Sequence, residues 1–306
     1  MEISRSKGIH RLAVVNAAAT VLLLVAGGLV TSKGAGLAVP DWPTTFGYNP
    51  FLYPWSLMVG NIFYEHSHRL IASAIGLSTI FLALALWLKE PRPWVRGLGL
   101  AALALVVAQG VVGGLRVVLL EQTLAILHAC LAQAFFALAV SLALFTSETW
   151  AAEPKRQEIP DAGRIQRLAV ITTVLIYAQI VFGAVLRHSG ELLIFHLVFA
   201  AVVSLHVMLL SLRVLTRHAA LRDLSRPALY LGALLFAQLA LGLGAYVAKF
   251  VMALPPWLAL TLRTGHVVVG ALMLAASLVL TLRSFRLFTR SVSAVVMPQA
   301  AKEASA

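Results

Sequence analysis

The sequence predicts an all-α integral membrane protein with eight transmembrane helices, arranged as two tandem, pseudo-symmetric four-helix bundles. Three observations predict this fold class. Apolar residues make up 60% of the 306 residues and charged residues only 12%, about half the charged share of a soluble domain. Eight stretches are apolar enough and long enough, at about 20 residues, to cross a bilayer. The two halves also share a pattern of glycine, glutamine and histidine. This composition excludes a soluble globular enzyme, a disordered chain and a disulfide-rich secreted module.

The eight stretches contain no Asp, Glu, Lys or Arg. The first, 12–31, is too long for the apolar core of a signal peptide and precedes no small-residue cleavage site, so we expect a membrane span. The others are 70–88, 97–115, 122–146, 168–186, 192–212, 228–248 and 264–282. None shows the period-2 alternation of a barrel strand, so each predicts a helix. Only the loops 33–65 and 147–167 are longer, which leaves no room for an extramembrane domain.

The basic residues predict how these spans are oriented. The net charge is +12 and the pI is about 10.6, yet the charges are spread between apolar stretches, so we expect no nucleic-acid partner. Eighteen of the 24 Lys and Arg residues, including Lys155 and Lys302, fall on one side. The other side has Lys33, Arg69, Arg116, Arg187, Lys249 and Arg263. The positive-inside rule then places both termini in the cytoplasm.

Matching residues recur in the two halves at a nearly constant offset. His68 and His196 are 128 residues apart, Gln109 and Gln238 are 129 apart, and His128 and His266 are 138 apart. Helices rich in Gly and Ala can look alike by chance, because small residues are common where membrane helices meet. Matched glutamines and histidines nevertheless favour duplication. We expect a parallel repeat, with one bundle in residues 1–150 and the other in residues 151–306.

The four matched histidines lie towards the outer starts of the even-numbered spans: His68, His128, His196 and His266. They should share one membrane depth, two in each bundle. Neutral imidazole is a common axial ligand of haem iron, and two facing histidines in a four-helix bundle can form a bis-histidine site. A single intramembrane histidine can equally be a hydrogen-bonded packing residue, but two duplicated pairs favour ligation. Zinc is less favoured, because no acidic or thiolate partner repeats with the histidines.

The other five histidines have no matched partner. His206 lies about 80° around its helix from His196, and we expect it to pack or to make a secondary contact. His10, His66, His188 and His218 lie near span ends, where we expect them to be solvated. His188 could also line an outer entrance.

Three outer arginines lie where the propionates of a porphyrin would point. Arg116, Arg187 and Arg263 are at the outer ends of spans, and a guanidinium group binds a carboxylate through a bidentate fork. Ordinary snorkelling of the side chain to the interface would explain each single arginine as well.

The first half carries two charged residues that the second half lacks. Glu65 and Arg69 flank His68, whereas the equivalent positions are Leu193 and Leu197. Glu65 precedes His68 by three residues, which places both on one helical face. A solvated acid at a helix N-terminus would explain Glu65 alone, but beside a porphyrin it could stabilise positive charge or move a proton. The first bundle is therefore expected to be a reaction site and the second an electron-transfer site.

The first outer loop supports this division. The loop 33–65 is much longer than its counterpart in the second half, and it carries Asp41, Trp42 and Trp55. We expect it to cover a pocket as an amphipathic cap.

Two runs resemble the haem A synthase family. The first is Gly27-Gly28-Leu-Val-Thr-Ser-Lys-Gly-Ala-Gly-Leu-Ala-Val-Pro-Asp-Trp-Pro, and the second is Glu65-His-Ser-His68-Arg69. The Pro-Asp-Trp-Pro loop and the Glu-x-x-His-Arg run are specific in combination, and the resemblance covers essentially the whole chain. One departure is the absence of the cysteine pair that many bacterial members have in the first outer loop. The only cysteine, Cys130, lies inside a span and cannot replace that pair.

The resemblance implies an oxidoreductase of the bacterial cytoplasmic membrane. Its reaction oxidises the C8 methyl group of haem O to a formyl group by successive hydroxylation, which gives haem A for cytochrome oxidase. The implied partners are membrane lipid, haem O synthase and an unidentified electron donor.

The resemblance also implies a role for each candidate residue. In the first bundle His68 and His128 would hold haem O, Glu65 would be the catalytic carboxylate, and Arg69 and Arg116 would contact the substrate. In the second bundle the axial ligands of a haem b cofactor would be His196 and His266, with propionate contacts from Arg187 and Arg263.

Two other functions compete with this one. A dihaem membrane cytochrome b-type electron carrier would also use two histidine pairs. Such carriers often stack their haems across the bilayer on shared helices, whereas here the histidines share one depth and Glu65 breaks the symmetry. A transporter that uses histidines for protons would predict inverted repeats and broken helices, and the sequence shows neither.

Overall fold

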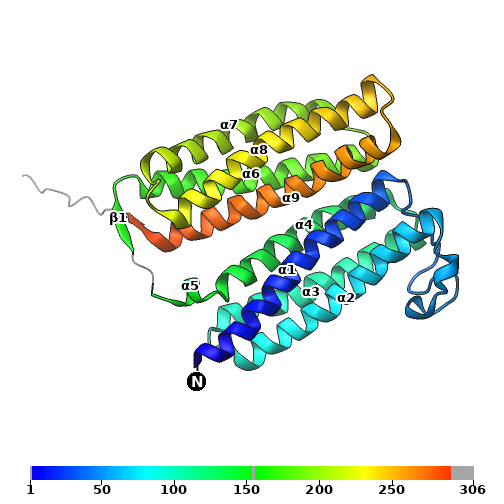
Figure 1. Cartoon of the computed structure of the whole chain (residues 1–306), viewed down its shortest axis with the longest axis horizontal. Helices are drawn as coiled ribbons and strands as arrows, with labels where there is room; N and C mark the ends of the chain where they lie inside the picture. The colour runs from blue at the N-terminus through cyan, green and yellow to red at the C-terminus, as the bar shows by residue number, and fades with distance from the viewer. Residues whose placement is uncertain (1, 154–155, 291–306) are drawn as a thin grey trace, which may run out of the picture.

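The computed structural model describes residues 2–153 and 156–290 (Figure 1). Its eight long helices are α1 (Glu2–Ser32), α2 (Gly60–Lys89), α3 (Pro93–Val118), α4 (Gln122–Phe145), α6 (Ala162–Ser189), α7 (Leu193–Arg217), α8 (Arg222–Tyr246) and α9 (Pro256–Leu287). Each is long and apolar enough to cross a membrane. The predicted all-helical membrane fold is therefore confirmed. Lys155 and Lys302, counted above among the basic residues, lie outside the described residues.

All the long helices except α4 are longer than the apolar stretches that predicted them. Helix α2 begins at Gly60, so its first turns already contain Glu65, His68 and Arg69. A helix can continue through the polar interface of a membrane, because side chains near its ends reach water. An apolar stretch in the sequence, by contrast, ends at the first charged residue. Pro256 is the first residue of α9. An N–H group at this position would have no acceptor within the helix, so the lack of one in proline costs no hydrogen bond.

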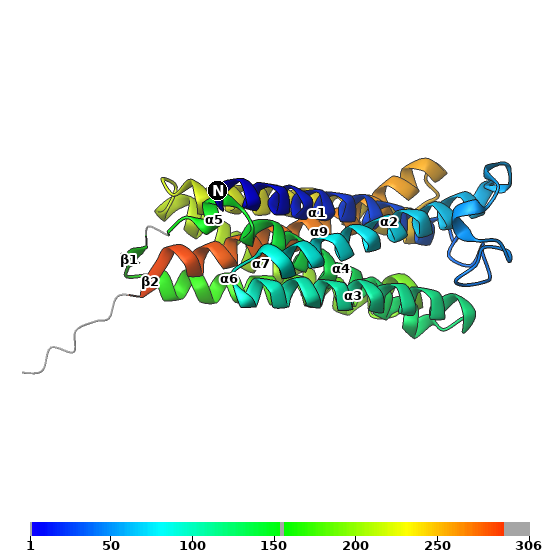
Figure 2. The ribbon, with the colours of Figure 1, turned by 90° about the horizontal axis from the view of Figure 1, so that it is seen from below.

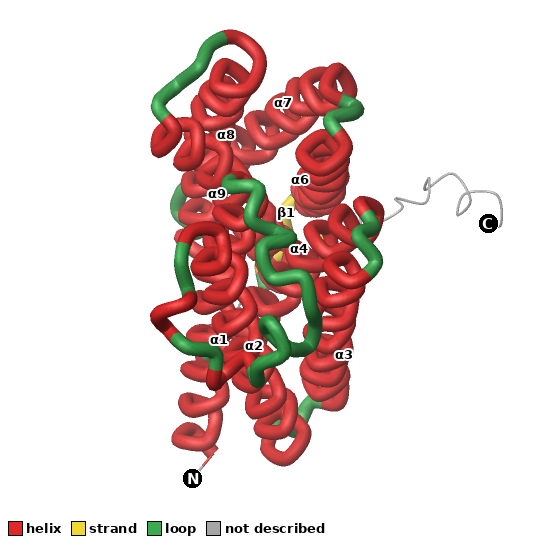
Figure 3. The backbone as a smooth tube through the Cα atoms, turned by 90° about the vertical axis from the view of Figure 1, so that its right-hand side faces the viewer, coloured by secondary structure: helices red, strands yellow, loops and turns green. Residues whose placement is uncertain are grey.

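The eight helices form two groups with the same order of neighbours. In the first group α1 packs on α2 and α4, and α3 packs on α2 and α4. In the second, α6 packs on α7 and α9, and α8 packs on α7 and α9. Figure 2 shows the helices running along one common direction, and Figure 3 shows the two groups end-on, side by side. Helices α1 and α4 meet α6 and α9 between the groups.

Each group has its own apolar core, and a third cluster joins them. Buried leucines dominate the first core, with Leu82, Leu86 and Leu142, and the second core, with Leu210, Leu231 and Leu280. The joining cluster contains Leu24 of α1, Phe136 of α4 and Ala271 of α9. The assignment of residues 1–150 and 151–306 as two domains with different roles remains a prediction.

The two ends of the molecule carry different connections. The start of α1 lies at the same end as the linker between the groups, which contains α5 (Glu148–Ala151) and β1 (Gln157–Ile159) (Figure 1). Strand β1 pairs in parallel with β2 (Phe288–Arg290), which follows α9. Strands of three residues are too short to give a pattern, and the sequence did not predict them. The opposite end carries the loop 33–59, with the short helices η1 (Pro50–Leu52) and η2 (Trp55–Leu57).

The chain between α8 and α9 is also longer than its counterpart in the first group. Helix α8 continues into a π-helical turn, η3 (Val247–Val251), before the chain reaches Pro255 and Pro256. This longer connection and the earlier start of α9 before His266 together account for the larger offset between His128 and His266.

Candidate functional site

Each of the four matched histidines lies against a glycine of a neighbouring helix in its own group. A Cβ atom at the glycine would lie 3.1 Å from His68 Cε1 at Gly27, 2.8 Å from His128 Cε1 at Gly113, 3.1 Å from His196 Cε1 at Gly183 and 2.8 Å from His266 Cε1 at Gly242. These distances are shorter than an ordinary van der Waals contact, so only glycine lets the imidazole lie this close to the helix. The duplication thus extends from residue types to side-chain packing.

Three of these glycines follow a glutamine by four residues, or about one helical turn. The pairs are Gln109 with Gly113, Gln179 with Gly183, and Gln238 with Gly242. The Gln109 amide donates to the backbone carbonyl of His128 at 3.1 Å, and the Gln179 amide donates to that of His196 at 2.9 Å. Gln109 and Gln238 were recognised in the sequence as a matched pair, whereas Gln179 was not. The triplicate Ala-Gln-x-x-x-Gly pattern was the signal that could have found it.

The second histidine pair is spaced to bind one metal ion between its rings. The ring centres of His196 and His266 are 6.2 Å apart. Because a metal–imidazole bond is about 2 Å long and a ring centre lies roughly 1.2 Å behind its nitrogen, two axial rings on one iron have centres about 6.4 Å apart. The Gln238 amide lies 3.5 Å from His266 Nε2. The distance between the two rings therefore fits a bis-histidine haem.

Among the described residues, no group of three or more His, Cys, Asp or Glu side chains is placed to hold a metal ion. Two histidines per site match the two axial positions that a porphyrin leaves on its iron.

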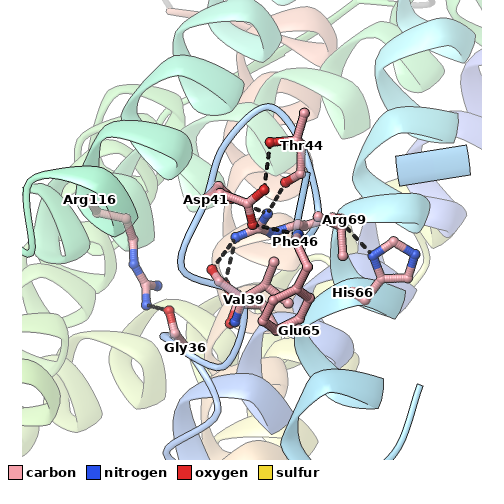
Figure 4. A network of polar contacts seen from close by, with 10 residues as sticks. Gly36, Val39, Asp41, Thr44, Phe46, Glu65, His66, Arg69 and Arg116 are labelled. Carbon is pink, nitrogen blue, oxygen red and sulfur yellow. Dashed lines mark hydrogen bonds and ion pairs between the residues drawn. The ribbon is translucent and has the colours of Figure 1, made fainter. Parts of the chain in front are cut away.

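Glu65 lies in α2, three residues before His68 of the first histidine pair. It is buried, with 4% of its surface exposed. Its Oε1 accepts a hydrogen bond from Arg69 Nη2 at 2.9 Å, and its Oε2 accepts one from the backbone N–H of Val39 at 2.9 Å (Figure 4). Arg69 also donates to the carbonyl oxygens of Val39 at 2.9 Å, Asp41 at 2.7 Å and Thr44 at 3.1 Å. The Glu65–Arg69 pair therefore fastens the outer loop to α2.

Asp41 closes a tight turn within this loop. Its carboxylate accepts hydrogen bonds from Thr44 Oγ1 at 2.5 Å, from the Phe46 N–H at 2.7 Å and from the Gly47 N–H at 2.9 Å. Partial burial alone would raise the pKa of Asp41, but these hydrogen bonds outweigh it and hold the pKa below its ordinary value of 3.8.

The loop also covers the outer end of α3. The Trp42 ring lies directly against Gly114, where a Cβ atom would overlap it, and Arg116 donates to the Gly36 carbonyl at 2.8 Å. Gly114 directly follows Gly113, the glycine that lies against His128. The loop thus rests on α2, which carries His68, and on α3, which carries the glycine that lies against His128.

The outer arginines all contact backbone carbonyls. Arg187 of α6 donates to the Gly28 carbonyl at 2.7 Å and to Ser32 Oγ at 2.8 Å, both in α1. Arg263 donates to the Ala248 carbonyl at 3.1 Å, and its buried Nε has no partner among the described residues. Arg69 donates to carbonyl oxygens of the loop, as described above. Propionate binding by these arginines remains a prediction.

An outer pocket of about 190 Å³ opens where the loop, α1, α3 and α6 come together. The residues that line it are Thr31, Gly34, Gly36, Leu37, Arg116 and His188. Of the two basic side chains at this pocket, Arg116 belongs to the first group and His188 to the second. The suggestion that His188 lines an outer entrance remains a prediction that this position supports.

The expectation that four histidines near span ends are solvated was wrong for His66. This side chain is buried at 1% exposure, with Nδ1 3.1 Å from Thr45 Oγ1 and the Tyr53 ring 5.0 Å away. The cause is the outer loop, which folds back over α2 and brings Thr45 and Tyr53 onto the histidine. His10 and His218 are also partly buried, against the Ala143 carbonyl and Asp161 respectively.

Comparison with known proteins agrees with this architecture. A family model described as COX15-CtaA, cytochrome oxidase assembly protein, matches residues 10–195, which include Glu65, His68 and His128. The chain is 30% identical over 191 residues to the heme A synthase of Shouchella clausii (strain KSM-K16), a match that covers 61% of this chain and 62% of that protein. It is also 30% identical over 183 residues to the heme A synthase of Alkalihalophilus pseudofirmus, covering 58% of each.

The chain thus spans about three fifths of the length of the curated relatives it matches. The family match itself covers more than half of the chain, from the first helix to the start of α7. It includes the loop that Glu65 and Arg69 hold, and it ends next to His196. This multi-pass membrane protein therefore belongs to the COX15-CtaA family of cytochrome oxidase assembly proteins.

Proposed function

We propose that this protein is a haem A synthase, which oxidises the C8 methyl group of haem O to a formyl group by successive hydroxylation. One observation carries the proposal: two histidine pairs lie on matched glycines, but among the described residues only the first pair has a buried carboxylate, Glu65, three residues before one of its histidines. The names of the two relatives support the same activity. Residues 1–150 would bind and oxidise the substrate, and residues 151–306 would hold a haem b cofactor.

The histidines would bind the two haems through their imidazole nitrogens. His68 and His128 would hold haem O, and His196 and His266 would hold haem b. The bound haems supply the redox chemistry, and the protein supplies their ligands, orientation and surroundings. The glycine beside each histidine keeps the imidazole close to its helix, so the ring is already placed before a ligand arrives.

Glu65 would act as the catalytic carboxylate at the edge of the substrate. Two donors, Arg69 Nη2 and the Val39 N–H, fix its orientation. A carboxylate held in this way can stabilise positive charge that develops on the reacting methyl carbon, and it can accept or return a proton. The loop above it would exclude water from the same region.

The outer arginines would bind the propionates. Arg116 borders the pocket beside the first bundle, and Arg187 and Arg263 lie at the outer end of the second. A guanidinium group that donates to one carbonyl still has further N–H donors for a carboxylate. Arg69, already engaged by the loop, would hold the cap over haem O.

The orientation follows from the basic residues and the position of the loop. Eighteen of the 24 Lys and Arg residues belong to the side that carries the linker, so we place both termini in the bacterial cytoplasm and the loop 33–59 on the opposite side. In this setting haem O synthase would supply the substrate from the membrane, and an unidentified electron donor would supply electrons.

Haem extraction tests the proposal. The protein is expressed with and without a haem O synthase, and the extracted haems are separated by chromatography. We expect haem A only when haem O is supplied, and haem b in both cases. Two haems b per protein and no haem A under both conditions would overturn the synthase assignment and favour a dihaem membrane cytochrome b-type electron carrier instead.

A further inference from the structure

The outer loop has a second face, which is exposed. Tyr53 and Met58 are buried, and the Tyr53 ring packs on His66 of α2. Large apolar side chains alternate with these buried residues and are exposed; we call them the apolar tip, and they are Phe51, Leu52, Trp55, Leu57 and Val59. Trp55 is 79% exposed and Leu52 is 75% exposed, so neither side chain packs closely on the rest of the protein.

The sequence of this loop is unusual for a segment surrounded by water. No charged residue occurs between Asp41 and Glu65, and aromatic residues recur throughout the interval. Soluble proteins rarely expose a large apolar patch unless it contacts a partner or a membrane. Tryptophan and tyrosine are enriched where membrane helices meet the lipid headgroups. The composition of the loop therefore matches the interface of a bilayer.

The apolar tip also lies at the height of that interface. Leu52 directly precedes Tyr53, whose ring centre is 5.0 Å from that of His66. His66 lies four residues before Leu70, where the apolar stretch of α2 begins, and four helical residues rise about 6 Å. The headgroup layer extends roughly 5–8 Å beyond the hydrocarbon on each side of a bilayer. Phe63 of α2, almost one turn further out than His66, is exposed as well. Apolar surface is therefore exposed at this height on both α2 and the loop.

A second connection at the same end has the same character. The chain between α8 and α9 exposes Phe250 and Met252, and Trp257 at the start of α9 is also exposed. No charged residue occurs between Lys249 and Arg263. Figure 1 shows this connection and the loop at the same end of the molecule, on opposite sides of it. A partner protein or a second copy of this chain would cover one side, whereas a lipid leaflet surrounds both.

We propose that the apolar tip is seated in the interfacial layer of the lipid leaflet at this end of the molecule, with Leu52 and Trp55 in contact with lipid. The other face of the loop is fastened to α2 by Glu65 and Arg69. Protein therefore holds the loop on one side and lipid holds it on the other. An anchor of this kind does not depend on the haem chemistry proposed above.

Fluorescence quenching in lipid vesicles tests the proposal. In the full chain, Cys130→Ser removes the only cysteine, and Leu52→Cys or Trp55→Cys then provides one site for a bimane label. Both side chains are exposed, so their replacement removes little packing within the protein. The vesicles are made of phosphatidylcholine, part of which carries a nitroxide quencher either near the headgroup or near the end of the acyl chain. Iodide on both sides of the vesicles is the quencher in water.

Two other exposed positions are the matched references. Phe236→Cys, within the apolar stretch of α8, reports lipid, and Glu191→Cys, between α6 and α7, reports water. We expect the nitroxide near the headgroup to lower the fluorescence of both tip labels more than the deep nitroxide or iodide does. The deep nitroxide should act most strongly on Phe236→Cys, and iodide on Glu191→Cys.

Two outcomes would overturn the proposal. One is quenching of the tip labels by iodide to the same extent as Glu191→Cys, which would place the tip in water. The other is protection from all three quenchers, which would show that protein covers the tip. Haem A formation is measured separately by haem extraction, so neither outcome alters the proposed function.

Discussion

Adding a methyl group at Gly113 should weaken the binding of haem O without lowering the unfolding temperature of the protein. In Gly113→Ala the new Cβ atom would lie 2.8 Å from His128 Cε1, about 0.6 Å short of the 3.4 Å at which ordinary contact begins. All three of its nearest atoms belong to the imidazole, so the ring would move and the helices would stay in place. A displacement of about 0.6 Å exceeds the tolerance of roughly 0.2 Å in a metal–ligand distance.

Gly110→Ala provides the matched control. It lies on the same helix, one turn earlier, and a Cβ atom there meets nothing within 4 Å. Both substitutions replace glycine by alanine inside a helix, which stabilises the helix by about 1 kcal/mol. The common gain cancels when the two variants are compared, and the difference reports the contact with His128.

The assay combines thermal unfolding in detergent with haem extraction. We expect both variants to unfold at or above the wild-type temperature. The affinity of the first bundle for haem O should fall roughly tenfold in Gly113→Ala alone, since misplacement by 1 Å can cost about 10²-fold in function. Haem b content should not change. Equal haem O affinity in the two alanine variants would refute the view that His128 is a haem ligand positioned by Gly113.

Three further predictions concern the loop and the second histidine pair. Glu65→Gln keeps one acceptor oxygen for Arg69 or for Val39, and Arg69 can still donate to the loop carbonyls, so the loop should stay in place and both haems should bind, yet formyl-haem should no longer form in the extraction assay. His196→Ala and His266→Ala should each lower haem b content more than haem O content, as measured by pigment extraction. The lowered pKa of Asp41 stabilises the loop above the ordinary pKa of 3.8, and this contribution should disappear as the pH falls through the folded-state value. Limited proteolysis of wild type and Asp41→Asn should therefore differ at pH 5 and converge at low pH.

Each of these predictions has an opposite outcome that would contradict it. Haem A at the wild-type level in Glu65→Gln would show that Glu65 is not the catalytic carboxylate. Arg69→Gln is the accompanying control, because it releases the loop while keeping the carboxylate. Preferential loss of haem O from His196→Ala would show that the roles assigned to the two bundles are reversed. Equal protease sensitivity of wild type and Asp41→Asn at pH 5 would show that the Asp41 turn does not hold the loop.

The sequence predicted the features that repeat along the chain. Eight apolar stretches gave eight helices, because a membrane imposes length and composition on every span. The matched histidines were found because duplication preserves residue type and spacing. The apolar stretches placed the start of α2 too late, since the helix continues through Glu65 and Arg69 into the interface.

Contacts between distant segments could not be predicted in the same way. Arg69 was expected to contact the substrate, which remains a prediction, but its hydrogen bonds to three carbonyls of a loop about 25–30 residues earlier in the chain were not foreseen. His66 was expected in solvent, and the same loop buries it. Gln179 was missed because its significance depends on an imidazole that projects from the next helix. A single sequence contains no signal for such pairs until the chain is folded.

The junction between the groups limits how independent the two halves can be. Gly27 lies against His68, while the next residue, Gly28, lies against Thr264 of α9 and accepts a hydrogen bond from Arg187 of α6. Thr264 in turn donates to Ser32, one turn further along α1. One helix therefore contacts both groups close to their histidine pairs. Although the two groups share one pattern of neighbours, a substitution on this turn of α1 is expected to disturb both.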